Sequence, residues 1–478
     1  MKTFFLDEHG CSKNQVDAEI LVSRLENLGL KRVQKANIAD LLLINTCGFI
    51  KSAKQESLTA LMNARKAYPS AKILFAGCLA ERYASEFAEN LPEADAIFGN
   101  GDLSKIDEVI MALNKGERLI LTPPQRGVCD GERNTLLNFP GSAYIKITEG
   151  CNNYCSFCAI PRIRGELRSR PIAAIVTEIQ ELVQRGIFEF NLIGQDLAAY
   201  GRDGVAPGAT GDVTYAQEPS PLKRLLEHIS ALSGDFWLRL LYIHPDHFPR
   251  DIVPVINADK RFLHYFDIPF QSGDNTIITL MNRVGTAAKY EKLVQSLRKN
   301  LRLDNGMPGA VIRTTFLCGF PNESDEAAKR TEEFLQKIQP DWSGCFTYSL
   351  EENTTSYTMQ NVVPKETAKK RAGRLQRLQS KITETRLKMH IGQTYRVLIE
   401  EIIEPVICST QQQCASTNAT EGLAIGRVWF QAPDVDGASV IRYDSKNKKE
   451  VAAIIPGTTV MVNVIGVSGV DLDTVLLV

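Results

Sequence analysis

The chain has 478 residues, of which 44% are hydrophobic and 23% charged, and its 55 basic and 56 acidic residues leave a net charge of −1. The length exceeds what one ordinary hydrophobic core can use, and the even charge balance excludes a general electrostatic attraction to nucleic acid. Residues 1–9 hold only a brief apolar stretch, which excludes a signal peptide or membrane span there and predicts a cytoplasmic protein. Disulfides are rare in that compartment. We therefore expect some of the eleven cysteines to bind metal or act in catalysis.

The N-terminal part of the chain, residues 1–125, alternates short apolar runs with helical patterns. Three runs predict β-strands, and two longer periodic segments predict helices between them: 3–6, 17–28, 40–44, 52–68 and 72–76. Strands separated by helices of this length form parallel sheets, so we expect an open, doubly wound α/β domain.

Three cysteines follow the three predicted strands, and each has a glycine beside it: Cys11, Cys47 and Cys78. Because ligands of open α/β sheets lie outside the carboxyl ends of the strands, the three thiols are expected to converge. A single cysteine at a strand end is more often a small buried hydrophobe. Three in matching positions favour a three-cysteine iron–sulfur site, with buried thiols as the alternative.

A predicted linker at 126–141 is rich in turn-forming residues, and a second α/β pattern follows it over 142–363. Six predicted strands lie in this region: 143–148, 188–193, 237–241, 264–268, 311–317 and 345–348. Six parallel strands with intervening helices close only part of a TIM-like barrel. Active residues are expected at the carboxyl ends of those strands.

The first of these strand ends carries a C-x3-C-x2-C triplet, formed by Cys151, Cys155 and Cys158. Thiolates select iron–sulfur clusters, zinc or copper, and a 4Fe-4S cluster normally takes four cysteines. Three ligands would leave one iron open. The spacing resembles that of the radical S-adenosylmethionine enzymes, which implies an open iron that binds the amino and carboxylate groups of S-adenosylmethionine. A zinc site would need a second C-x2-C or an H-x3-H pair nearby, and none follows; three buried thiols are the other alternative.

Residues 364–390 predict a long basic helix with only Glu366 and Glu384 as acidic residues. Its nine basic residues are Lys365, Lys369, Lys370, Arg371, Arg374, Arg377, Lys381, Arg386 and Lys388. A charged run of this kind is usually a solvated helix face, and contact with RNA is the alternative. The opposite face is predicted to pack on the barrel through four apolar residues: Leu375, Leu378, Ile382 and Met389.

From residue 391 to residue 478 the pattern changes to five short alternating runs separated by turns, which predicts a small five-stranded β-barrel. Barrels of this kind often bind oligonucleotides. This one carries ten acidic and six basic residues, and an acidic surface repels phosphates.

Three features of the chain together resemble the methylthiotransferases of the radical S-adenosylmethionine superfamily over almost the whole length. They are the segment Gly10-Cys-Ser-Lys-Asn-Gln-Val-Asp-Ala-Glu19, the triplet segment 149–171 with its ending Arg168-Ser-Arg-Pro171, and the terminal module, which is similar to a TRAM domain. The resemblance implies a methylthiotransferase N-terminal domain at 1–125, a radical S-adenosylmethionine barrel at 142–363 and a TRAM domain at 391–478.

The same resemblance implies the cofactors and their residues. An auxiliary 4Fe-4S cluster is expected on Cys11, Cys47 and Cys78, and a second 4Fe-4S cluster on Cys151, Cys155 and Cys158. S-adenosylmethionine is expected in a pocket that includes three further residues: Phe157, Gln195 and Gly319.

Two branches of the family compete for the match. Five segments are similar to the RimO branch, which modifies an aspartate on a small-subunit ribosomal protein: 10–14 with 16–17, 194–196, 240–242, 348–352 and, above all, 430–437. An acidic terminal module agrees with that substrate, since opposite charge steers the encounter with a basic partner. Two positions depart from the RimO pattern. Ser272 stands where the RimO type usually has histidine, and in this it is similar to the branch that modifies an N6-modified adenosine in tRNA. Asn353 replaces an expected glycine.

The resemblance implies radical chemistry in which S-adenosylmethionine is reduced at the triplet cluster, hydrogen is removed from the aspartate β-carbon, and a methylated sulfur is delivered from the auxiliary cluster. A radical cofactor suits an unactivated C–H bond, which resists acid–base chemistry. The implied partners are the ribosomal protein, bound through the TRAM domain, and an external flavodoxin- or ferredoxin-like electron donor. From a different class, the chain could be a redox-sensing RNA-binding protein whose clusters are structural.

Overall fold

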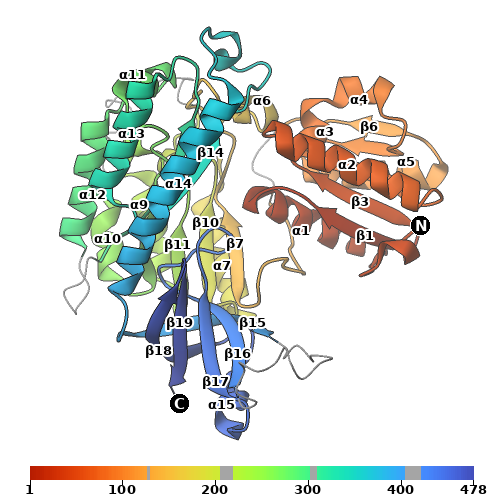
Figure 1. The fold of residues 1–478 in the computed structure, drawn as a ribbon. Helices are drawn as coiled ribbons and strands as arrows, with labels where there is room; N and C mark the ends of the chain where they lie inside the picture. Colours follow the sequence, from red (N-terminus) through yellow and green to blue (C-terminus); the bar gives the residue numbers. More distant parts are fainter. Residues whose placement is uncertain (126–129, 205–218, 302–308, 404–420, 478) are drawn as a thin grey trace, which may run out of the picture.

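The computed structural model describes residues 1–125, 130–204, 219–301, 309–403 and 421–477, so part of the predicted linker (126–129) lies outside the described residues. An N-terminal α/β unit lies beside a central partial barrel, and a small β-barrel lies at one end of the central barrel (Figure 1). None of the helices within the described ranges is long and apolar enough to cross a membrane.

The N-terminal unit is a six-stranded parallel sheet in the order β2-β1-β3-β4-β5-β6. Its strands are β1 (Thr3–Glu8), β2 (Lys31–Arg32), β3 (Leu41–Thr46), β4 (Lys72–Gly77), β5 (Ala96–Phe98) and β6 (Leu119–Leu121), and its helices are α1 (Ser12–Asn27), α2 (Lys51–Ala67), α3 (Cys78–Arg82), α4 (Ala84–Asn90) and α5 (Ile106–Lys115). Helices α1 and α5 pack on one face and α2, α3 and α4 on the other, which confirms the doubly wound prediction. The sequence does not predict β2, β5 and β6, because two or three residues are too few to show a periodic pattern.

The strand order decides where this sheet can bind a ligand. Strand β1 lies between β2 and β3, so the winding direction of the chain reverses between β1 and β3. Open sheets bind ligands at the carboxyl ends of the strands beside such a switch point. Cys11 and Cys47 follow the two strands that flank it.

The central unit has six parallel strands in sequential order, which confirms the predicted partial barrel. The strands are β7 (Ser142–Lys146), β10 (Glu189–Ile193), β11 (Trp237–Leu240), β12 (Phe262–Asp267), β13 (Val311–Cys318) and β14 (Trp342–Thr347), and the helices outside them are α7 (Ile172–Gln184), α9 (Pro221–Ser230), α10 (Ile252–Ala258), α12 (Ala287–Asn300) and α13 (Asp325–Ile338). Side chains such as Phe190, Leu238 and Phe266 are fully buried between the strands and these helices. Each buried side chain of this size contributes roughly 1.5–3 kcal/mol, so this layer holds the sheet rigid.

Helix α14 (Lys365–Lys388) lies against β14 and α13 on the outside of the central barrel (Figure 1). Leu375 and Ile382 are buried and Leu378 is partly buried, as predicted. The prediction for Met389 is wrong, because this side chain is 46% exposed. Met389 comes after the last helical residue, where the chain leaves the central barrel, and Leu387 packs instead in the core shared with the terminal module.

The terminal module is a closed five-stranded barrel in the order β15-β16-β17-β19-β18, as predicted. Its elements are β15 (Thr394–Ile403), β16 (Glu421–Val428), β17 (Ser439–Asp444), α15 (Lys448–Ala453), β18 (Thr459–Ser468) and β19 (Asp471–Leu477). Residues 404–420 lie outside the described residues.

The segment between β16 and β17 enters the amino-terminal end of the central barrel, and we call residues 429–437 the plug. Phe430 and Gln431 are buried there, and the indole N–H of Trp342 donates to the Phe430 carbonyl at 2.8 Å. The hydroxyl of Tyr265 donates to Asp436 at 2.7 Å. The terminal module therefore closes the end of the central barrel that lies opposite the cysteine triplet.

Candidate functional site

The three N-terminal cysteines lie together at the carboxyl edge of the first sheet. Cys11 is exposed just before α1, Cys47 follows β3, and the buried Cys78 is the first residue of α3. Burial raises the pKa of the Cys47 thiol to about 12, and the charges of Cys78 and Cys11 add to the rise. Thiols that oppose each other's ionisation lie within electrostatic reach of one another, so the fold brings these three residues together.

Two glycines let the loops that carry these thiols approach each other. Gly77 has φ +99°, a conformation that residues with a side chain rarely adopt. A Cβ atom on Gly48 would lie 2.7 Å from the carbonyl oxygen of Cys78, which is too close for any carbon. The glycines beside Cys47 and Cys78 are therefore required by the shape of this edge.

The triplet occupies the loop between β8 (Thr148–Glu149) and α6 (Ile160–Ile163). The Cys158 N–H donates to the Cys155 carbonyl at 2.9 Å, which closes a tight turn. Burial raises the pKa of Cys158 to about 12, with Cys155 as the next cause. Burial also raises the pKa of Cys151, followed by the charges of Asp196 and Cys158. These three thiols form a second group at the carboxyl end of the central barrel.

A wall of buried polar side chains lies beside Cys155. His244 Nε2 is 3.9 Å from Cys155 Sγ, and the rings of His244 and His247 stack with 4.7 Å between centroids. His247 Nε2 lies 2.5 Å from Asp196, which also accepts a hydrogen bond from Asn153 at 2.8 Å. Burial lowers the pKa of His244 to about 3, so this ring is neutral at neutral pH. The stacked rings and the Asp196 hydrogen bonds hold His244 in place beside Cys155, and His244 itself is uncharged there.

The three residues predicted to contact S-adenosylmethionine lie at the carboxyl end of the barrel but at different strands. Phe157 is half-buried and packs against an apolar cluster around Phe320. Gly319 follows β13 with φ +80°. Gln195 follows β10, and its Nε2 donates to Glu149 at 2.8 Å. Phe157 and Gly319 therefore lie on the β13 side of the site, while Gln195 is fixed by the residue that precedes the triplet loop.

Two buried oxygen atoms next to the triplet, Thr148 Oγ1 and Gln195 Oε1, have no hydrogen-bond partner within the described residues. A Cβ atom on Gly194 would lie 2.0 Å from Thr148 Oγ1, so the two strand ends touch here. Buried polar atoms are nearly always paired, and unpaired ones mark places that a ligand or water completes. With two groups of three soft thiols beside them, these atoms fit two iron–sulfur clusters and a polar cofactor.

The described side chains contain no set of three His, Cys, Asp or Glu residues that converges on one point to hold a single metal ion. A zinc ion needs such convergence, because its ligands surround one centre. An iron–sulfur cluster takes its thiolates on separate irons, so its ligands stand further apart. Among the described residues, neither thiol group therefore forms a preassembled site for a single ion.

The two thiol groups meet at α6. Cys78 packs against Ala159 and Ile163, which follow the triplet directly. Helix α3, which begins at Cys78, contacts α6 across the boundary between the two units (Figure 1). One short helix therefore separates thiols that are more than seventy residues apart in the chain.

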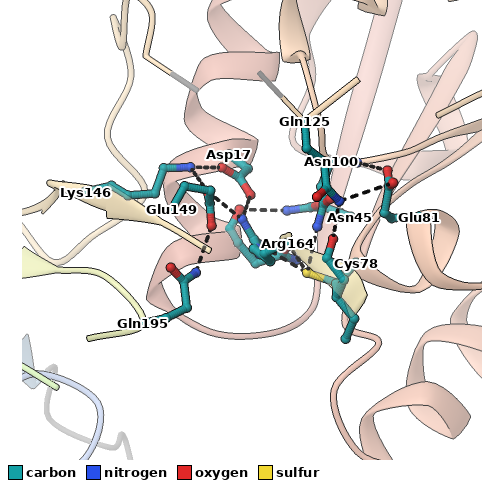
Figure 2. A network of polar contacts seen from close by, with 12 residues as sticks. Asp17, Asn45, Cys78, Glu81, Asn100, Gln125, Lys146, Glu149, Arg164 and Gln195 are labelled. Carbon is teal, nitrogen blue, oxygen red and sulfur yellow. Dashed lines mark hydrogen bonds and ion pairs between the residues drawn. The ribbon is translucent and has the colours of Figure 1, made fainter. Parts of the chain in front are cut away.

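Figure 2 shows a buried charge network at this junction, which the sequence analysis does not predict. Arg164, directly after α6, donates to Asp17 at 2.7 Å, to Glu149 at 3.0 Å and to Cys78 Sγ at 3.1 Å. Lys146 donates to the same two carboxylates. Burial alone would raise the pKa of Glu149, but the charges of Arg164 and Lys146 hold it at about 2. One signal was present in the sequence: Lys146 is a charge inside an apolar predicted strand, and a buried charge needs a partner.

An open groove of about 1100 Å³ runs between the N-terminal unit and the carboxyl end of β14. Leu79, the neighbour of Cys78, lines it together with Gly319. Its remaining wall mixes aromatic and aliphatic residues, such as Tyr83, Phe87, Tyr348, Leu350, Tyr357 and Val362, with charged ones: Lys51, Lys54, Glu86, Glu352 and Lys365. Apolar surface left open beside a reactive site marks a binding surface.

Three family models match successive parts of the chain: the uncharacterized protein family UPF0004 at residues 3–99, the radical SAM superfamily at 145–335 and the TRAM domain at 391–476. A protein of Treponema denticola named ribosomal protein uS12 methylthiotransferase RimO is 49% identical over 98% of this chain and 100% of that protein. A protein of the same name from Syntrophomonas wolfei is 35% identical over 97% of each chain.

The solved structures show the same fold at low identity. The radical S-adenosylmethionine methyltransferase TsrM from Kitasatospora setae, with cobalamin and a [4Fe-4S] cluster bound, is 14% identical with a TM-score of 0.53, over 74% of this chain and 77% of that one. This likeness concerns the fold alone, and it agrees with the predicted architecture of the central barrel.

Proposed function

The chain belongs to the RimO family of radical S-adenosylmethionine methylthiotransferases, and we propose that it inserts a methylthio group at the β-carbon of an aspartate in ribosomal protein uS12. A reaction that first opens a C–H bond and then adds sulfur needs two reactive sites within reach of one carbon. The observation that carries the proposal is the packing of Cys78 against Ala159 and Ile163, which sets the first thiol group against the short helix that follows the second.

Two sets of three cysteines are the cluster ligands in this proposal: Cys11, Cys47 and Cys78 in domain 1–125, and Cys151, Cys155 and Cys158 in domain 142–363. S-adenosylmethionine and the two 4Fe-4S clusters, when bound, supply the radical that removes hydrogen and the sulfur that replaces it. The raised pKa values of Cys47 and Cys158 support close groups of thiols, which give up their protons when metal binds.

The remaining residues of the site orient and shield the reactants. Gln195 Oε1 and Thr148 Oγ1 are the buried acceptors for the donor groups of S-adenosylmethionine. Glu149 holds Gln195 in place through the hydrogen bond at 2.8 Å. Phe157 offers an apolar surface beside the adenine, and Gly319 leaves room at the end of β13.

The substrate reaches the thiols through the groove between the N-terminal unit and β14. Its wall of apolar, aromatic and charged side chains suits an extended polypeptide, whose own side chains alternate along the strand. The acidic terminal module binds the basic body of the ribosomal protein at the other end of the central barrel. An external one-electron donor of the flavodoxin or ferredoxin kind supplies the electron, and a ribosomal substrate places the reaction in the cytoplasm.

Helix α14 supplies a second contact, with the RNA around the ribosomal protein. Seven of its nine basic residues are exposed, while Arg371 and Arg386 are ion-paired with residues of the central barrel. Lys370, Arg377 and Lys381 lie on one outward face, because their spacing of seven and four residues follows the helical period. Such a stripe attracts phosphates, and the acidic terminal module does not.

The test is mass spectrometry of uS12 from a strain that lacks this protein, complemented with the wild type or with Cys155→Ala. Only the wild type should restore a methylthio-aspartate peptide. If uS12 is unmodified in the wild-type strain while the purified protein still forms 5′-deoxyadenosine, the proposed substrate is refuted and the radical chemistry is not. Failure to form 5′-deoxyadenosine from S-adenosylmethionine with both clusters loaded would refute the radical chemistry.

A further inference from the structure

Arg164 belongs to the central barrel by sequence but contacts a cysteine of the N-terminal unit. Its side chain is 2% exposed. One terminal nitrogen, Nη2, donates to Cys78 Sγ at 3.1 Å and to Asn14 at 3.4 Å. The other, Nη1, donates to Asp17 and Glu149. One guanidinium therefore touches a thiol of one group and the carboxylate that precedes the other group.

The charges of this network balance without the thiol. Lys146 and Arg164 bring two positive charges, and Asp17 and Glu149 bring two negative ones, all in side chains that are 1–2% exposed. Hydrogen bonds from a cation to an anion are the strong ones, and a site closed to water screens them little. The N–H that points at Cys78 is therefore a strong donor to sulfur when that sulfur ligates a metal.

The same guanidinium is linked to the predicted cofactor pocket. One carboxylate oxygen of Glu149 accepts from Arg164, and the other accepts from Gln195 Nε2 at 2.8 Å (Figure 2). Arg164, Glu149 and Gln195 form a continuous chain of hydrogen bonds from Cys78 to the triplet side of the junction. A movement of the N-terminal unit would disturb both ends of that chain.

We propose that Arg164 is a positioning residue that raises the reduction potential of the auxiliary cluster and keeps Cys78 in register with Glu149 and Gln195. The inference rests on the proposed cluster at Cys11, Cys47 and Cys78. A charged donor to a ligating thiolate draws negative charge from the cluster and favours its reduced state. Without that donor, the auxiliary cluster is harder to reduce.

Arg133 offers a matched control at the same junction. It is 4% exposed and binds Glu19 of α1 at 2.6 Å and Glu178 of α7 through its Nε at 3.0 Å. Its described partners are carboxylates on both units. Replacing it weakens the same junction and removes a buried guanidinium, but it leaves the contact to Cys78 intact.

The experiment uses the full chain with Cys151, Cys155 and Cys158 changed to alanine, so that the N-terminal thiols alone can hold a cluster. After anaerobic loading with iron and sulfide, the electron paramagnetic resonance (EPR) signal is followed through a redox titration. Arg164→Gln should lower the midpoint potential, Arg164→Lys should lower it less, and Arg133→Gln should leave it unchanged. An unchanged potential in Arg164→Gln, or an equal shift in Arg133→Gln, overturns the inference.

Failure of the parent variant to bind any iron would refute the proposed auxiliary cluster, which is a separate result. A second measurement needs no change at Arg164. In the parent variant grown with arginine carrying ¹⁵N in the guanidinium, pulsed EPR of the reduced cluster should show a nitrogen coupling. Its absence overturns the contact even where Arg164→Gln does not fold.

Discussion

The hydroxyl of Tyr265 lies 2.7 Å from the carboxylate of Asp436, inside the central barrel, although the two residues belong to different units. Burial raises the pKa of Asp436 from 3.8 to about 6, against the opposing charge of Arg313. The plug therefore brings into the barrel a carboxyl group that holds its proton to a higher pH than a free aspartate does.

This pKa predicts how stability depends on pH. Because the pKa of Asp436 is higher in the folded state than in the unfolded state, its contribution to stability is complete below pH 3.8 and is lost as the pH rises through about 6. Asp436→Asn should remove this loss. The free energy of unfolding of the variant, taken relative to that of the wild type, should therefore be about 1–2 kcal/mol more favourable at pH 8 than at pH 5. Denaturant titrations of both proteins at the two pH values measure this difference. An equal change of the free energy of unfolding with pH in the two proteins would contradict the prediction.

Glu189 predicts a large loss of stability at the junction with the terminal module. It is buried between Arg427 at 2.6 Å and Arg239 at 2.9 Å, and these charges keep its pKa well below the ordinary value despite burial. Glu189→Gln removes the counter-charge of Arg239 and one of the two carboxylates at Arg427, which keeps Glu400, and should cost about 3–5 kcal/mol in urea denaturation. The half-exposed pair of Glu421 and Arg442 is the control: Glu421→Gln should cost less than about 1 kcal/mol, and equal losses would contradict the prediction.

At Gly319 the effect of a steric clash on stability can be separated from the effect of a left-handed backbone conformation. Its Cβ would lie 2.3 Å from Cβ of Ala368 on α14, and its φ is +80°. Gly392 has nearly the same φ, +81°, with nothing within 4 Å of its Cβ position. Both changes to alanine should cost about 1–2 kcal/mol for the left-handed backbone, and Gly319→Ala about 1–3 kcal/mol more for the clash. Thermal unfolding of the two variants tests the difference, which should be absent if α14 shifts freely.

Loss of a cysteine from one thiol group should remove the function of that group and leave the function of the other intact. Cys78→Ala should lose about half of the iron, because one of two clusters loses a ligand, yet it should still form 5′-deoxyadenosine without a methylthio product. Cys151→Ala should lose the other half and form no 5′-deoxyadenosine. Cys345→Ala, a buried thiol outside both groups, is the control and should keep full iron. Loss of 5′-deoxyadenosine in Cys78→Ala with the triplet cluster intact would contradict the division of roles.

The basic face of α14 should contribute to binding of the small ribosomal subunit. Changing Lys370, Arg377 and Lys381 together to glutamate should weaken binding and reduce the slope of log affinity against log salt by roughly 2–3, as expected for lost phosphate contacts. A charge-matched triple change on α12 and α13, at Lys299, Lys329 and Lys337, should have a much smaller effect. Equal effects would mean that net charge, rather than this face, decides binding.

The strands of the central barrel could be predicted to within a few residues, because each is a run of apolar residues between turns. The meeting of Cys11, Cys47 and Cys78 also followed from local pattern, since parallel strands end at one edge of a sheet. The contact of Arg164 with Cys78 could not be predicted, because it joins two units and depends on how they pack.

The departure at Asn353 from the RimO pattern also has a physical explanation. Its φ is +62°, a left-handed conformation that asparagine tolerates better than other residues with a side chain. The asparagine therefore keeps the backbone shape that a glycine would give. This departure says nothing about the substrate.

The plug has a consequence for how a target residue is chosen. It fixes the terminal module at one end of the central barrel, while both thiol groups lie at the other, and a six-residue strand spans about 20 Å. Under the proposed function, a substrate protein bound to the module must present its reactive side chain at about that distance from the point of binding. A loop of a different length would then stay unmodified whatever its amino-acid sequence.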